Sequence, residues 1–231
     1  MSERILGIVP ARGGSKRLPG KNIRDLCGKP LVAWTIEQAK KSRYLDKIIV
    51  STDDEEIAEI SKEYGAEVPF LRPKELAKDD SPSIDLIKHA VNYFKSKGEI
   101  FDIVVLLEPT SPLRKDDDID NAIELFLEKH PESVISVFEI NDRFYWTLNI
   151  KNGYITPFFD KKYLQANIKD LPRLYAPNGA ISISSVQELI KSRSFYLNKS
   201  LPYFMPAERS IDIDTELDFK IAKILINDVI E

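Results

Sequence analysis

The 231-residue sequence has little of two residue types that define whole classes of protein. A single cysteine, Cys27, excludes an internal disulfide framework, and there is no Cys/His cluster that would predict a zinc site. Only two histidines occur, and neither forms an obvious arrangement with a serine that would favour serine-nucleophile catalysis. We therefore expect a protein of a reducing compartment, with a cytoplasmic location.

Long apolar runs and an excess of one charge are also absent. The run 5–9 stops at Pro10 and is too short for a signal peptide or a membrane span. The formal net charge is −4 with both signs interspersed, so the broad positive surface that binds nucleic acid is not expected. With 43% hydrophobic residues the chain can bury one substantial core, and we expect a single domain over 1–231.

Short apolar runs alternate with amphipathic segments along most of the chain. We expect strands near 4–10, 48–52, 103–107, 133–138 and 181–184, and helices near 30–39, 54–64, 83–97, 119–129, 186–191 and 215–227. This alternation predicts an α/β fold with a mostly parallel sheet between two layers of helices, which binds ligands beyond the carboxyl ends of its strands. From 141 to 174 the pattern changes to aromatics, glycine and prolines, which predicts an arm suited to a dimer contact.

A loop rich in glycine and cations, Pro10 to Asn22, follows the first strand. Gly13 and Gly14 allow close approach of the backbone to a ligand, and Ser15 adds a donor. The cations of the loop are Arg12, Lys16, Arg17 and Lys21. This composition is typical of a polyphosphate site, although it matches neither a Walker A loop nor the GxGxxG fingerprint. The alternative is an ordinary solvated loop.

A pair of acidic residues near the C-terminus, Asp212 and Asp214, predicts a metal site. In an extended segment residues two apart face the same way, so the two carboxylates share one side while Ile211 and Ile213 face the core. Two oxygen ligands on one face suit Mg²⁺, which completes its shell with water and phosphates. The alternative is that Asp214 caps the helix starting near Thr215.

Two further segments carry weaker signals. In the first, Thr110, Ser111 and Arg114 follow a strand and could orient a polyhydroxylated acid, but two prolines there are equally typical of a turn. In the second, Asn178 and Gly179 precede the last predicted strand and could form only a turn.

In this order the segments resemble the acylneuraminate cytidylyltransferases, or CMP-sialic acid synthetases, and relatives acting on legionaminic and pseudaminic acids. The resemblance runs nearly end to end and rests on Pro10–Asn22, Val50–Asp54, Phe70–Pro73, Glu75–Ala77, Leu107–Arg114, Pro177–Ala180 and Ser210–Glu216. It implies a Rossmann-like, three-layer nucleotide-diphospho-sugar transferase fold. It also implies that CMP passes from CTP to the anomeric hydroxyl of a nonulosonic acid with Mg²⁺ present, in a homodimer whose arms reach into the neighbouring sites.

The same resemblance implies roles for individual residues. The catalytic residues are Arg12, Lys21, Asp212 and Asp214, and the two aspartates bind the metal. The nucleotide-binding residues are Ala11, Arg12, Gly13, Gly14, Ser15, Lys16, Lys21, Asn22, Arg72 and Ser83. The acceptor-binding residues are Glu108, Thr110, Ser111, Arg114, Tyr175, Asn178 and Gly179.

Two departures from the family pattern concern the acceptor. The family usually has Gln at the position of Glu108, and an arginine-rich stretch followed by Gln at 165–168. A carboxylate cannot donate the hydrogen bonds of an amide, and a missing arginine removes a planar partner for an acid group. We therefore expect an acceptor with a free or differently substituted amine, or one held by other cations, in place of N-acetylneuraminate. A nucleotidyltransferase using a phosphorylated acceptor and a catalytically silent nucleotide-binding homologue are the alternatives.

Overall fold

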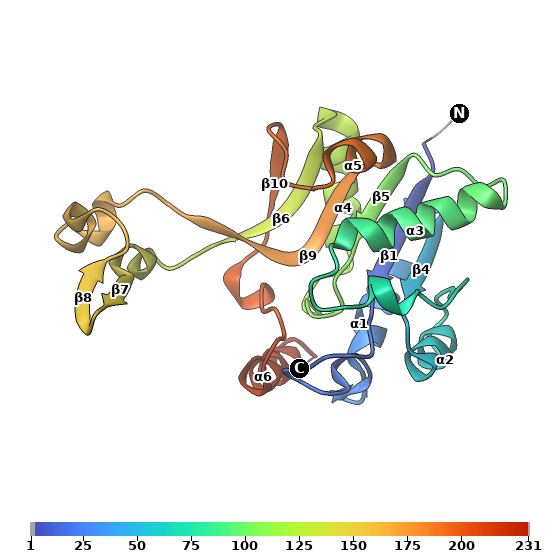
Figure 1. Ribbon diagram of the computed structural model, residues 1–231, viewed down its shortest axis with the longest axis horizontal. Helices are drawn as coiled ribbons and strands as arrows, with labels where there is room; N and C mark the ends of the chain where they lie inside the picture. Colours follow the sequence, from blue (N-terminus) through green and yellow to red (C-terminus); the bar gives the residue numbers. More distant parts are fainter. Residues whose placement is uncertain (1–2, 231) are drawn as a thin grey trace.

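The computed structural model describes residues 3–230, and only the backbone of 228–230 (Figure 1). Residues 1, 2 and 231 of the predicted domain lie outside the described residues. No helix within the described part of the chain is long and apolar enough to cross a membrane.

A six-stranded mixed sheet forms the centre of the molecule, in the order β10-β6-β9-β5-β1-β4. These strands are β1 (Ile5–Pro10), β4 (Lys47–Ser51), β5 (Ile103–Leu106), β6 (Ser133–Glu139), β9 (Tyr175–Ser185) and β10 (Ser200–Phe204). The strands β4, β1 and β5 run parallel to one another, as do β6 and β10, whereas β9 is antiparallel to both of its neighbours.

Helices cover both faces of this sheet, as the sequence predicts. The helices α1 (Leu31–Lys40), α2 (Glu55–Glu63) and α4 (Asp118–Lys129) share one core cluster with Ile5 and Val9 of β1. The helices α3 (Ser83–Ser96) and α5 (Val186–Ser192) share a second with Leu6 and Ile8. Alternate residues of β1 face opposite helix layers, so the residues on both faces of the strand must be apolar. This explains the continuous apolar run. The predicted three-layer α/β fold is confirmed.

A third core cluster lies under the C-terminal helix α6 (Glu216–Ile230). It joins Phe219 and Ile226 of α6 to Leu18, Leu26 and Leu113. Three short elements complete this side, namely the 3-10 helix η1 (Lys21–Ile23) and the paired strands β2 (Asp25–Leu26) and β3 (Lys29–Pro30). This packing brings the C-terminal part of the chain against the loop that follows β1.

Between β6 and β9 the chain leaves the sheet as a projecting arm (Figure 1). The arm carries a hairpin of β7 (Leu148–Lys151) and β8 (Tyr154–Pro157), and the 3-10 helices η3 (Asp142–Trp146), η4 (Lys161–Leu164) and η5 (Ile168–Asp170). The hairpin turn has positive φ at Asn152 (52°) and Gly153 (81°), as a tight Asn-Gly turn requires. Large apolar side chains stay open on it, with Ile150 77% and Ile155 68% exposed.

Two features of the sheet differ from the sequence prediction. The edge strand β10 was not expected, because Pro202 and polar residues hide its apolar pattern. The strand expected at 181–184 is much longer, and β9 already begins at Tyr175. Asn178 and Gly179 therefore lie inside a strand, at a register shift opposite Ile135 and Val137, so the turn alternative for them is wrong.

Candidate active site

The Pro10–Asn22 loop is held against the carboxyl end of β4 by backbone contacts. Ala11 N donates to Ser51 O at 3.0 Å, and Gly13 N donates to Asp53 Oδ1 at 3.1 Å. A Cβ added at Gly13 would lie 2.5 Å from Asp54 Oδ2, whereas nothing lies within 4 Å of one at Gly14. Asp54 cannot easily move, because its Oδ1 caps α2. Only glycine therefore fits at position 13, while position 14 has no such restriction.

Side chains of this loop open onto a cavity of about 560 Å³. Its walls contain four cations, two carboxylates and two neutral polar residues, namely Arg12, Lys16, Arg17, Lys21, Asp79, Asp214, Ser15 and Asn22. Asn22 is buried and donates to Arg12 O at 2.9 Å, which fixes the turn of the loop. The predicted phosphate-binding cations therefore surround one polar cavity with an excess of positive charge.

Asp79 was not singled out by the sequence, yet it pairs with two of these cations. Its carboxylate lies 2.7 Å from Arg12 Nη1 and 2.5 Å from Lys16 Nζ. Hydrogen bonds from Lys16 and Arg12 hold the pKa of Asp79 below its usual value. An internal anion thus uses the same donors that a phosphate group would use.

Lys21 joins the N-terminal loop to the acidic pair. Its Nζ donates to Ile213 O at 2.7 Å and to Asp214 Oδ1 at 3.0 Å, and its side chain is only 12% exposed. Arg17 reaches Asp214 Oδ2 at 3.1 Å from the solvent side. The two strongest sequence signals, which lie at opposite ends of the chain, thus meet at one cavity.

The acidic pair lies in an extended segment just before α6. Ile213 is fully buried and Ile211 packs partly on the same cluster, which leaves both aspartates on the other side. Ile213 N donates to Thr110 O at 2.8 Å, so the segment lies along the loop after β5. Burial and the neighbouring Asp214 raise the pKa of Asp212, although a hydrogen bond from Thr110 opposes the shift.

The cap of α6 is made by two other residues. Asp218 Oδ2 accepts from Thr215 N at 2.7 Å and from Asp214 N at 3.1 Å, and Asp218 N donates back to Thr215 Oγ1 at 3.3 Å. This reciprocal arrangement is a capping box. The alternative in which Asp214 caps the helix is wrong, and its carboxylate is available for other partners.

Arg114 has a different place from the one predicted. It is 4% exposed, and its guanidinium donates to internal acceptors only: Gln38 Oε1, Glu108 O, Ala180 O and Thr35 Oγ1. Burial lowers the pKa of Arg114 to about 9. The side chain holds the loop after β5 on α1 and β9, and its donors are not directed at a ligand.

Ser111 and Asn178 are also used inside the protein. Ser111 Oγ donates to Asn178 O at 2.9 Å, and Asn178 Nδ2 donates to Ser210 Oγ at 2.9 Å. Asn178 Oδ1 accepts from Ser136 Oγ at 2.5 Å. These bonds connect β6, β9 and the segment that leads to Asp212. Ser111 and Asn178 therefore hold the segments around the candidate site in place through internal hydrogen bonds.

A second cavity of about 280 Å³ lies on the other side of Glu108. Its walls include the predicted residues Ser83, Glu108 and Gly179, and also Arg193, Ser194, Phe195 and Tyr196. Burial and the nearby Asp212 raise the pKa of Glu108 to about 7. The segment 193–196 was missed by the sequence analysis, because only the antiparallel path of β9 returns it to this position. The sequence feature that could have indicated this segment is the pair of adjacent aromatic residues, Phe195 and Tyr196, shortly after a predicted helix.

Tyr175 lies apart from both cavities. It is at the start of β9, 43% exposed, with its ring 5.2 Å from that of Phe204. Within the described chain it lines a separate hollow at the base of the arm, beside Glu139 and Arg173. Tyr175 is therefore not on the wall of either cavity, and its contact with the acceptor stays a prediction.

Arg72 is on the wall of neither cavity. It is 5% exposed, and its Nη2 donates to Ser51 O at 2.6 Å. Burial lowers the pKa of Arg72, while the charges of Asp53 and Glu108 raise it and that of Arg12 lowers it. The guanidinium is thus within electrostatic reach of both the phosphate loop and the second cavity.

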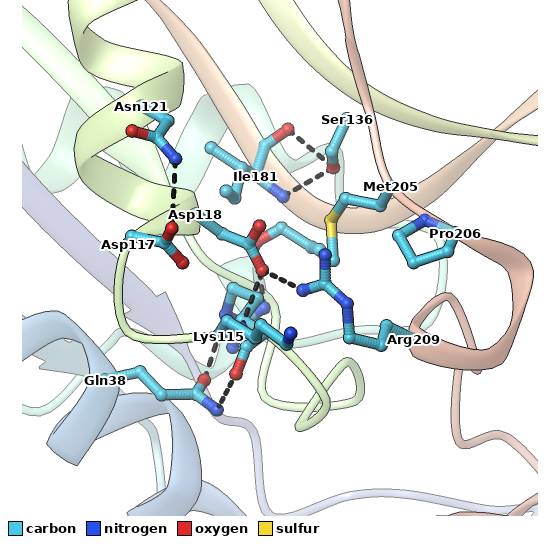
Figure 2. Close-up of polar contacts among 12 residues, drawn as sticks. Gln38, Lys115, Asp117, Asp118, Asn121, Ser136, Ile181, Met205, Pro206 and Arg209 are labelled. Carbon is cyan, nitrogen blue, oxygen red and sulfur yellow. Dashed lines mark hydrogen bonds and ion pairs between the residues drawn. The ribbon is translucent and has the colours of Figure 1, made fainter.

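A buried ion pair fixes the turn that leads into the acidic segment. Figure 2 shows Arg209 pointing at Asp118, the first residue of α4, and the two form a hydrogen-bonded ion pair. Asp118 also accepts from Tyr203 Oη at 2.9 Å and from Lys115 N at 2.6 Å. One carboxylate therefore ties together the loop after β5, β10 and the 3-10 helix η6 (Ala207–Arg209).

Comparison with known proteins identifies the family of the chain. A family model described as cytidylyltransferase matches residues 6–222. The chain is 39% identical to CMP-N,N'-diacetyllegionaminic acid synthase of Legionella pneumophila, over 96% of each protein. It is 34% identical to pseudaminic acid cytidylyltransferase of Campylobacter jejuni over 95% of each, and 39% identical to N-acylneuraminate cytidylyltransferase of Escherichia coli, covering 96% of this chain and 52% of that protein.

Solved structures share the fold at low sequence identity. CMP:2-keto-3-deoxy-manno-octonic acid synthetase complexed with CTP superposes with a TM-score of 0.73 at 16% identity, over 98% of this chain and 99% of that one. A 4-diphosphocytidyl-2C-methyl-D-erythritol synthase superposes with a TM-score of 0.68 at 10% identity, with the same coverage. With its loop cations and Asp214 at one cavity, and with relatives matched along nearly the whole chain, this protein belongs to the cytidylyltransferase family and is a nucleotidyltransferase.

Proposed function

We propose that the protein transfers CMP from CTP to the anomeric hydroxyl of a nonulosonic acid, with release of pyrophosphate. The observation that carries the proposal is the contact of Lys21 with Asp214, which joins a cationic cavity to an acidic pair. A triphosphate substrate needs both kinds of charge. The relatives named for legionaminic, pseudaminic and acylneuraminic acids support the choice of acceptor class.

The acidic pair suits a divalent cation. Among the side chains that the structure describes, those of residues 3–227, no group of three or more His, Cys, Asp or Glu is arranged to hold a metal. Two carboxylates on one face fit Mg²⁺, and Asp212 forms no ion pair within those residues. Asp212 and Asp214 would hold the ion, which when bound supplies positive charge next to the substrate phosphates.

The residues of the chain act on the charges of the reaction. The anomeric hydroxyl gives its proton to water as its oxygen forms a bond to the α-phosphorus, and the bond from that phosphorus to the bridging oxygen breaks as pyrophosphate leaves. Arg12, Lys16 and Lys21 neutralise negative charge that moves towards the leaving group. Arg12 and Lys16 become available when the phosphates replace Asp79 as their partner. Positioning of both substrates supplies most of the remaining acceleration.

The second cavity is our proposed acceptor site, with Glu108 on its wall. A carboxyl group at this position favours an acceptor whose nearby substituent donates hydrogen bonds or carries a positive charge. We therefore propose an acceptor with a free or differently substituted amine in preference to N-acetylneuraminate. Arg193, on the wall of the same cavity, forms an ion pair with Asp85, with 2.8 Å between Arg193 Nη2 and Asp85 Oδ1.

A screen of acceptors with CTP and Mg²⁺ tests this function. We expect pyrophosphate release with at least one nonulosonic acid among N-acetylneuraminate, legionaminate, pseudaminate and their amino-bearing analogues. A clear preference for N-acetylneuraminate would contradict the role given to Glu108. Release only with a phosphorylated sugar would favour the alternative acceptor class, and CTP binding without release for any acceptor would favour a silent homologue.

The proposal includes a homodimer formed through the arm. Ile150 and Ile155 are cross-strand partners in the hairpin, and both are largely exposed, which is typical of a surface that another chain covers. We expect the native mass of the protein to be that of two chains, and the double variant Ile150→Glu with Ile155→Glu to have the mass of one chain.

A cytoplasmic location stays a prediction, supported by the single cysteine.

A further inference from the structure

Arg72 and two residues linked to it each carry a buried polar atom without a partner. Four buried side-chain nitrogen or oxygen atoms of residues 3–227 make no hydrogen bond, and three of them are Ser51 Oγ, Arg72 Nε and His89 Nδ1. Buried polar atoms in proteins nearly always have a partner, so such a group needs a cause. The common neighbour is Arg72, which bonds to the carbonyl of Ser51 and whose charge acts on His89.

The segment that carries Arg72 lies directly against His89. Arg72 N donates to Thr52 O at 2.6 Å, which attaches the segment to the end of β4. On the other side, the ring of Phe70 meets the His89 ring edge-on, with centroids 4.4 Å apart and planes at 89°. Tyr93, one turn further along α3, packs on the same Phe70 ring at 5.0 Å. His89 and Tyr93 thus support one segment, but only His89 has a ring nitrogen.

The chemistry of the two unpartnered nitrogens is complementary. Arg72 Nε can only donate a hydrogen bond, and a neutral imidazole offers one acceptor nitrogen. Burial, together with the charge of Arg72, lowers the pKa of His89, which favours the neutral imidazole. The tautomer with its proton on Nε2 leaves Nδ1 as an acceptor, which is the group that a cationic donor requires.

We propose that His89 is a positioning residue for Arg72, whose Nε–H takes His89 Nδ1 as its acceptor when nucleotide is bound. Ser51 O holds the Nη2 side of the guanidinium, and His89 holds the Nε side, so the plane of the group is fixed towards the cytidine. The inference rests on the proposed function, because it requires Arg72 to contact CTP. It assigns a role in nucleotide affinity to a helix residue outside both cavities.

Three variants test the inference by direct calorimetric titration of CTP at pH 8 and by steady-state kinetics. We expect His89→Leu to raise the Kd and KM for CTP about tenfold, the loss of about 1.4 kcal/mol that one hydrogen bond to a charged group supports, with kcat within about twofold. His89→Asn keeps an acceptor near Nδ1 and should stay within about threefold of the wild type. Tyr93→Leu removes the other ring under Phe70 and should lower the melting temperature while leaving the Kd unchanged.

The pH dependence of CTP binding gives an independent readout. As the pH falls below the ordinary imidazole value of 6.5, protonation of His89 places a second positive charge beside Arg72, so the Kd of the wild type should rise. Asp53, Glu108 and Arg12 also act on Arg72, so the informative quantity is the difference between the wild-type and His89→Asn profiles.

Two results would overturn the positioning role. One is a wild-type Kd in His89→Leu, and the other is a loss of affinity in Tyr93→Leu equal to that in His89→Leu. A double variant with Arg72→Lys sharpens the test, because His89→Leu should add no further loss once the guanidinium is gone. Absence of CTP binding in the wild type would instead overturn the proposed function.

Discussion

The Pro10–Asn22 loop and the loop at 107–114 leave the neighbouring parallel strands β1 and β5 at the same edge of the sheet. Both carry arginine, hydroxyl groups and proline, and both resemble ligand-binding loops in sequence. In the first loop Arg12, Lys16 and Lys21 open onto a cavity. In the second, Ser111 and Arg114 turn inward and are buried.

The difference follows from the position of each strand in the sheet. β1 is followed by a loop that lies beside α6 and the end of β4, where a cavity stays open. β5 is followed by a loop that packs between α1 and β9, where buried carbonyls need donors. A charged side chain in a site loop therefore does not by itself indicate contact with a ligand. Ser111 and Arg114 of the second loop stabilise the fold, whereas the cations of the first loop open onto the cavity.

The largest expected effect is on the acidic pair that faces the first loop. We expect Asp212→Asn and Asp214→Asn each to lower kcat by about 10²–10³. Each variant weakens the hold on Mg²⁺, whose positive charge stabilises the negative charge that develops on the phosphates, and such a loss costs several kcal/mol. Thermal unfolding should remain close to that of the wild type, since both carboxylates are on the open side of the segment. Near-normal turnover with Mg²⁺ in both variants would remove the metal assignment.

Arg114→Met tests the inward-facing loop through stability. The variant leaves the carbonyls of Glu108 and Ala180 without a donor, so we expect the free energy of unfolding to fall by about 3 kcal/mol. Arg17→Met is the matched control in the first loop. Its side chain is 75% exposed, and we expect a change within about 0.5 kcal/mol. Similar losses of stability in urea titrations of the two variants would break the comparison.

Glu108 gives the second loop a pH dependence. Its pKa is raised to about 7 in the folded protein, above its ordinary value of 4.5, so the native state binds the proton more tightly than the unfolded state. The stabilisation that the proton of Glu108 gives the folded protein is fully present below pH 4.5, and it is lost as the pH rises to about 7. Glu108→Gln should therefore be more stable than the wild type at pH 8, by about 2 kcal/mol in chelator, but not at pH 4.5. Equal stability of the two proteins at pH 8 would contradict this role.

The two glycines of the first loop provide an internally matched pair. Gly13→Ala forces a Cβ against Asp54, which must displace the loop, whereas Gly14→Ala meets open space. We expect the KM for CTP to rise about tenfold in Gly13→Ala and by less than about twofold in Gly14→Ala. Steady-state kinetics with varied CTP compare them, and equal effects would show that the loop is not held against β4 during turnover.

The smallest expected effect concerns Asp79, the internal partner of the loop cations. Asp79→Asn removes a charge that competes with phosphate for Arg12 and Lys16. Because Asp79 is 44% exposed and water screens the pairs, we expect the Kd for CTP to fall only about threefold. Weaker CTP binding in this variant would indicate that Asp79 helps to hold the nucleotide.

Much of this molecule was predictable from local pattern. Apolar runs and helical periodicity located five of the six sheet strands and all six α-helices, because burial on both faces of a sheet demands them. The pairing of Asp212 and Asp214 on one side followed from the period of an extended chain. The family resemblance was carried by contiguous motifs and agrees with the relatives found over nearly the whole chain.

Long-range contacts decided the rest. Whether Arg114 meets a ligand or a carbonyl depends on α1 and β9, which approach it from residues 38 and 180. The insertion of β9 between β5 and β6, antiparallel to both, brought the unpredicted segment 193–196 to the second cavity. The amino-acid sequence by itself determined which residues are apolar, charged or free to adopt positive φ. Only the tertiary structure decided which charged groups lose water and find internal partners, because burial is a property of the packed chain and not of any segment.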